Sequence, residues 1–134
     1  MKSIDENYLA KFAARELGPE HFDHRGHLWM AWQHLACYEV DEASRRVCQG
    51  IRELAVKFGV PEKFNHTLSE ALMRIMAERM HGDSSNDFDA FLRANPDLDD
   101  DCIGVLARHY SDERLNSESA RSAWVEPDRL PLNQ

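Results

Sequence analysis

The sequence predicts an all-α fold, a single-domain orthogonal bundle of about six helices with an extended C-terminal tail. Apolar residues recur at the three- and four-residue intervals of amphipathic helices through most of the 134 positions. Nowhere do apolar and polar residues alternate as they do in half-buried strands. The length is that of one ordinary domain. We therefore expect one helical domain over residues 1–134, with the tail starting at about residue 125.

The first two helices are predicted from their apolar positions and their end residues. The first has an apolar face formed by Leu9, Phe12, Ala13 and Leu17. It is expected to stop at Gly18-Pro19, because proline cannot continue a helix. The second begins after Asp23, a good N-cap. From residue 28 to 38 it is apolar on almost every side, which is typical of a central helix surrounded by neighbours.

Two longer helices are expected next, each with a recognisable end. One runs from about residue 41 to 58 and is stopped by Gly59 and Pro61. The other runs from about 65 to 80 and ends in the polar loop that starts at His81. Both have an apolar stripe along one side only, so we expect them to pack on the central helix.

The sequence of the last third of the chain predicts shorter helices. A helix over residues 88–92 is expected to end before Pro96, and a sixth helix carries Ile103, Val105, Leu106 and Tyr110. A last turn or helix lies around 117–124. Two prolines then force an extended tail, and its apolar residues indicate that it lies on the body of the protein.

Charge and composition narrow the class of partner. The formal net charge is −8 and the isoelectric point is near 5.3. This charge opposes binding to nucleic acid or to an anionic membrane, since phosphate contacts depend on clustered lysine and arginine. We expect a small-molecule substrate, with a homo-oligomer as a further possibility.

The N-terminal residues and the cysteines predict a cytoplasmic protein. The chain starts without an apolar signal-peptide stretch and contains no apolar run long enough to span a membrane. Its three cysteines are Cys37, Cys48 and Cys102. They are odd in number and widely spaced inside helical patterns, so we expect reduced and mostly buried thiols.

The most distinctive feature is a histidine cluster at the start of the central helix. His24, His27 and His34 lie within roughly 80° of one another on a helical wheel. With Asp23 as the N-cap, His24 and His27 fall in the first turn, where the helix dipole lowers an imidazole pKa. Neutral imidazole binds metals and acts as a general base.

A metal site needs a third ligand, and His66 is the best candidate in the sequence. The predicted site holds one zinc, iron, nickel or copper ion through His24, His27 and His66. Glu70, one turn after His66, or Tyr110 would act as base or fourth ligand. This pattern predicts a metal-dependent enzyme for a small organic substrate. His66 and Glu70 lie opposite the apolar stripe of their helix, so another segment would have to cover them.

Three alternatives remain open at this point. The histidines can be buried, hydrogen-bonded helix-start residues without a ligand. His24, Arg25 and the free N–H groups can instead bind a small anionic ligand, with Gly26 allowing close approach. The protein can also be a non-catalytic interaction module, for which Trp29 and Trp124 are the expected anchors.

Four groups of residues stand out as motifs: Phe22-Asp23-His24-Arg25-Gly26-His27-Leu28 with Ala31-Trp32, Asn65-His66-Thr67-Leu68, Asn95-Pro96-Asp97-Leu98 and Arg108-His109-Tyr110-Ser111. Together, over about residues 22 to 128, they resemble a family of small uncharacterised bacterial all-helical proteins. The resemblance implies a helical fold with a shared site. It implies no particular reaction.

Overall fold

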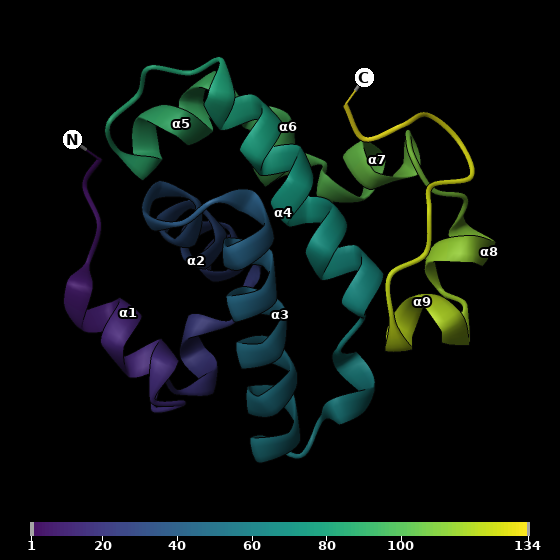
Figure 1. Cartoon of the computed structure of the whole chain (residues 1–134), viewed down its shortest axis with the longest axis horizontal. Coiled ribbons are helices and arrows are strands. Elements are labelled where there is room, and N and C mark those ends of the chain that lie inside the picture. Colours follow the sequence, from purple (N-terminus) through teal and green to yellow (C-terminus); the bar gives the residue numbers. More distant parts are fainter. Residues whose placement is uncertain (1, 134) are drawn as a thin grey trace.

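The computed structural model describes residues 2–133 and confirms the all-α fold (Figure 1). The α-helices of these residues are α1 (Glu6–Ala13), α2 (His24–Cys37), α3 (Val40–Lys57), α4 (His66–His81), α5 (Phe88–Ala94), α6 (Pro96–Asp100), α7 (Cys102–Ala107), α8 (Asp112–Leu115) and α9 (Glu118–Ser122). Short 3₁₀ turns cover Pro19–His21 and Pro61–Lys63. None of these helices has the length and apolar character needed to cross a bilayer.

Helix α2 is the centre of the bundle, as its sequence predicts. Leu28, Met30 and Trp32 are fully buried, and even the polar Gln33 has no exposed surface. Helices α3 and α4 pack on α2, and α1 and the start of α5 lie on its other sides (Figure 1). The polar ends of α2 are therefore the parts of this helix that can form a site near the surface.

Helix α1 ends at Ala13, four residues before the predicted last apolar position. Arg15 has a left-handed φ of 60°, and its guanidinium donates to the carbonyls of Phe12 and Ala13. These bonds satisfy carbonyls that the helix leaves without partners at its end. Leu17 is still buried, but it packs from the irregular segment that follows the turn and not from the helix.

The bundle has more short helices than the sequence predicts, because prolines start helices here as well as stopping them. Helix α5 ends at Ala94, as expected. Pro96 is then the first residue of α6, a position where its missing N–H has no cost. Asp97 of α6 accepts two hydrogen bonds from Arg79, at 2.5 and 2.8 Å. This pair joins α6 to the end of α4.

The extended C-terminal segment lies on the body, as predicted. Thr67 on α4 donates to the carbonyl of Ala123 at 2.8 Å and accepts from the amide of Val125 at 3.1 Å. The Tyr110 hydroxyl donates to the Val125 carbonyl at 2.7 Å, and His109 donates to the Leu130 carbonyl at 2.9 Å. Four partly buried hydrogen bonds thus hold this segment against α4 and the end of α7.

Candidate functional site

His24 joins α2 to α6. Its Nε2 lies 2.8 Å from the carbonyl oxygen of Leu98, so the ring donates this bond. Leu98 is fully buried and belongs to the Asn95-Pro96-Asp97-Leu98 motif. Two of the motifs singled out in the sequence therefore meet through this hydrogen bond.

The side chains of His27 and His34 are partly or fully buried, and they contact different residues. His27 is half-buried beside the ring of Phe22, and burial and the nearby His24 lower its pKa. His34 is buried and donates from Nδ1 to the Met30 carbonyl at 2.7 Å. Burial also lowers the pKa of His34. Both pKa shifts favour the neutral imidazole, and burial is the main cause.

Lowered histidine pKa values make the stability of the protein depend on pH. In the unfolded chain an imidazole takes up a proton near pH 6.5, whereas buried His27 takes it up only at lower pH. We expect stability to fall as the pH drops below about 6.5, by at most roughly 1.4 kcal/mol per pH unit for each such imidazole. The slope should be smaller in the His27→Gln variant.

Urea denaturation at pH 7.5 and at lower pH values measures this slope. His81 is exposed at the end of α4, so His81→Gln is the matched control and should leave the slope unchanged. Equal slopes in the wild type and in His27→Gln would contradict the expectation.

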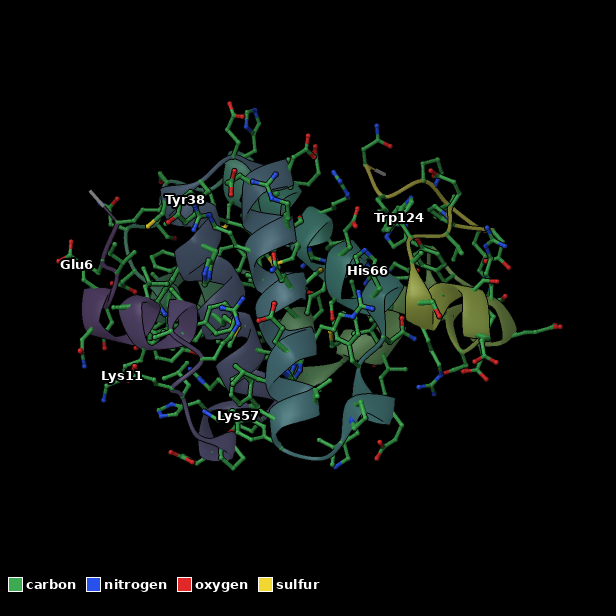
Figure 2. The ribbon with its side chains drawn as sticks, turned by 60° about the horizontal axis from the view of Figure 1, so that its bottom comes forward. Glu6, Lys11, Tyr38, Lys57, His66 and Trp124 are labelled. Atoms are coloured by element: carbon green, nitrogen blue, oxygen red, sulfur yellow. The ribbon has the colours of Figure 1, made fainter. Side chains whose placement is uncertain are left out.

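The structure places His66 beside Glu70 on α4, with both side chains partly buried. The His66 Nε2 lies 2.9 Å from one Glu70 carboxylate oxygen, and Arg74 donates to the other oxygen at 2.9 Å. Arg74 also reaches Asp41 at 3.2 Å and lies over the ring of Trp124. Figure 2 shows His66 and Trp124 on the same side of the molecule, opposite α1. Glu70 is thus already bound on both oxygens.

The structure does not bring His66 together with His24 and His27. His66 and Arg79 are 13 positions apart on α4, which is a rise of about 20 Å. Arg79 contacts Asp97, and the next residue, Leu98, receives the hydrogen bond from His24. His66 and His24 therefore lie near opposite ends of α4.

The metal centre consequently stays a prediction. Residues 2–133 contain no group of three or more His, Cys, Asp or Glu side chains arranged to hold a metal ion. Tyr110, the other expected catalytic residue, is buried, and its hydroxyl donates a hydrogen bond to the Val125 carbonyl. Burial raises the pKa of Tyr110, so the phenol stays protonated.

The groups expected to bind an anion at the start of α2 have other partners. The Asp23 carboxylate accepts from the Gly26 amide at 2.7 Å, which caps the helix. A Cβ on Gly26 would overlap the carbonyl of His21, so the glycine makes room for the chain itself. Arg25 pairs with Asp89 at 3.3 Å and with Asp99 at 3.5 Å.

The predicted interaction anchors are not exposed aromatic side chains. Trp29 is half-buried and packs on Trp32 and Phe88, with ring centroids 6.0 and 5.3 Å away. Trp124 is half-buried between Arg74 and Tyr110. Each ring is therefore used in packing within the chain.

A cleft that the sequence does not predict lies between the N-terminal segment, the start of α2 and the start of α5. Its volume is about 470 Å³, within the range of about 300–1,000 Å³ typical of small-molecule sites. Three aromatic side chains line it, and we call it the aromatic cleft: Tyr8, Trp29 and Phe88. Four carboxylates also line it: Glu20, Asp23, Asp87 and Asp89.

The aromatic cleft has an excess of negative charge. Its four carboxylates face one guanidinium, that of Arg25, which leaves a net charge of −3 when His21 is neutral. Arg25 lies over the Phe88 ring, 6.0 Å from its centroid, while it pairs with Asp89. The cleft therefore already holds one cation of the chain against an aromatic face and a carboxylate.

Tyr8 is a buried polar group of the cleft without a partner. Its side chain is 6% exposed, and its hydroxyl makes no hydrogen bond within the described residues. Burial and the nearby carboxylates of Asp23 and Asp5 raise the pKa of Tyr8 to about 12. Leaving such a group unpaired costs about 1–3 kcal/mol. The hydroxyl is therefore protonated and enclosed by the chain, and the ring of Tyr8 is the part of this residue that a ligand in the cleft can contact.

Each component of the cleft has an ordinary local explanation in the sequence. Asp23 and Asp87 are helix N-caps, and the aromatic residues fit the apolar faces of their helices. The combination arises only because residues about 60 positions apart in the chain, Trp29 and Phe88, come into contact. A surplus of carboxylates at two helix starts is the one hint that the sequence offers.

Comparison of the chain with protein-family models, with curated proteins and with solved structures finds no match. The resemblance to bacterial helical proteins therefore stays a prediction. The function has to be argued from the geometry of the aromatic cleft.

Proposed function

We propose that this protein binds a small organic cation in the aromatic cleft. The observation that carries the proposal is the combination of three aromatic rings with four carboxylates around one volume of about 470 Å³. The ring faces are negative, and a cation over such a face gains about 0.5–2 kcal/mol. The Arg25 guanidinium over Phe88 is an internal example of this contact.

The charge of the cleft favours a cation over an anion. An anion would meet the carboxylates of Glu20, Asp87 and Asp89 and would have to compete with two of the chain's own carboxylates for Arg25. The aromatic rings favour an organic cation over a metal ion, because Ca²⁺ and Mg²⁺ need several oxygen ligands at about 2.0–2.6 Å. An alkylammonium ion can contact both kinds of group in the cleft. Its charge would lie at the carboxylates and its carbon chain on the aromatic rings.

Binding of butylammonium should be measurable by titration calorimetry at low ionic strength. Trp29→Leu keeps an apolar side chain but removes the ring face, so we expect affinity to fall by a factor of roughly 2 to 30. Trp124→Leu removes a half-buried tryptophan outside the cleft and should leave the affinity unchanged. Circular dichroism checks that both variants fold.

Two results would count against the proposed function. One is the same affinity in the wild type and in Trp29→Leu. The other is the absence of butylammonium binding at low salt, where a charged cleft is least screened.

We also infer a cytosolic location. Cys37, Cys48 and Cys102 are free thiols in the structure, and burial raises the pKa of Cys48 to about 12. Contrary to expectation, Cys37 is exposed, so only two of the three thiols are shielded from solvent. Free cysteines are typical of proteins kept in a reducing compartment.

A further inference from the structure

We infer that the cation is a linear aliphatic diamine, protonated at both ends. This inference rests on the proposed function and names the class of ligand. Its basis is the arrangement of the charges: Glu20 and Asp23 come from the segment that leads into α2, whereas Asp87 and Asp89 come from the start of α5. Two separate elements thus each supply a pair of carboxylates to one cleft.

Arg25 shows that one aliphatic chain with a cationic end can span these two elements. Its backbone is in the first turn of α2, and its guanidinium reaches Asp89 on α5 at 3.3 Å. A ligand chain of similar length can place one ammonium group at the α2 carboxylates and the other at the α5 carboxylates. A monoamine can satisfy only one of the two pairs.

The aromatic residues form a row that suits the methylene groups of such a ligand. The ring centroids of Tyr8 and Trp29 are 6.1 Å apart, and those of Trp29 and Phe88 are 5.3 Å apart. The row runs from α1 across α2 to α5. Each methylene group that is buried on these rings adds to the affinity, which favours an aliphatic chain over a compact cation.

The carboxylates of the cleft favour an ammonium group that carries N–H bonds. Their oxygens can accept hydrogen bonds from a primary ammonium. A quaternary ammonium has no N–H to donate. An amino acid is disfavoured because its carboxylate would add to the surplus of negative charge, while Arg25 is already held by Asp89 and Asp99.

Calorimetric titration of the full chain at low salt with three probes tests the inference. The probes are pentane-1,5-diamine, pentylamine and the bis-trimethylammonium analogue of the diamine. We expect the diamine to bind roughly tenfold more tightly than pentylamine, in line with one extra charge-assisted contact, and more tightly than the quaternary analogue.

Asp87→Asn supplies a variant that changes charge with little change in shape. Asp87 caps α5 by accepting from the Ala90 amide at 2.7 Å, and asparagine caps a helix about as well as aspartate does. The preference for the diamine over pentylamine should shrink toward equal affinity in this variant. Asp101 caps α7 in the same way outside the cleft, so Asp101→Asn should keep the preference.

The possible results separate the two proposals. Equal affinity for pentylamine and the diamine overturns the diamine inference and leaves cation binding intact. A quaternary analogue that binds as tightly as the diamine overturns the inference that the ligand donates N–H bonds to the carboxylates. No binding by any of the three probes overturns the proposed function itself.

Discussion

A chain that ends at Ser122 is expected to be much less stable than the full chain. The deleted segment supplies the partners of Thr67, His109 and Tyr110, whose exposed fractions are 0%, 3% and 1%. Its removal breaks four hydrogen bonds, each worth about 0.5–1.5 kcal/mol net, so roughly 2–6 kcal/mol is lost. Such a loss is a large part of the whole stability of a typical domain, about 5–15 kcal/mol.

Thermal melting followed by circular dichroism measures this effect. A chain ending at Leu132 is the matched control, because it keeps the bonds to Thr67, His109 and Tyr110, and its melting temperature should stay close to that of the full chain. Tyr110→Phe removes only one hydrogen bond and should cost about 1 kcal/mol. A cooperative melt of the Ser122 chain within a few degrees of the full chain would show that the segment is dispensable.

The Gly26→Ala substitution is expected to lower both stability and cation binding. A Cβ at this position would overlap the backbone carbonyl of His21, which cannot move aside as the end of a flexible side chain can. The chain would have to shift either the turn over Pro19–His21 or the cap formed by Asp23. Overpacking of this kind costs about 1–3 kcal/mol and occasionally more.

The loss of binding follows because His21, Asp23 and Gly26 line the aromatic cleft. Urea denaturation and titration with butylammonium measure the two effects on the same preparation. Gly82→Ala is the control, since no atom lies within 4 Å of a Cβ built there. The expectation fails if Gly26→Ala keeps both the denaturation midpoint and the affinity of the wild type.

The helices and their starts could be read from the sequence because they depend on near neighbours. Asp23 caps α2, as the sequence predicts, and Asn65 caps α4 where that helix was expected to begin. Each accepts a hydrogen bond from the amide three residues ahead. The early end of α1 could not be read in this way. It depends on the left-handed backbone of Arg15, which also forms an ion pair with Glu53 on α3.

The candidate site shows the same division between local and distant contacts. The placement of His24 and His27 in the first turn of the most buried helix follows from periodicity and the cap. A lowered pKa of His27 was expected from the helix dipole, whereas burial is its main cause in the structure. The hydrogen bond from His24 to the Leu98 carbonyl joins residues 74 positions apart, and no local sequence pattern predicts it. The predicted third ligand, His66, lies near the other end of α4 for the same reason: spacing along one helix does not specify how two helices meet.

By itself, the sequence determined the all-α class, the central helix, the capped helix starts and the extended tail. These features follow from helical periodicity and from hydrogen bonds within about four residues. Only the tertiary structure decided which polar groups are already paired and which surfaces share a volume. The aromatic cleft exists because Tyr8, Trp29 and Phe88 come together from three helices and leave the Tyr8 hydroxyl without a partner in the described chain. Contacts of this kind depend on how whole helices pack against one another, and the residue pattern along a single helix does not specify that packing.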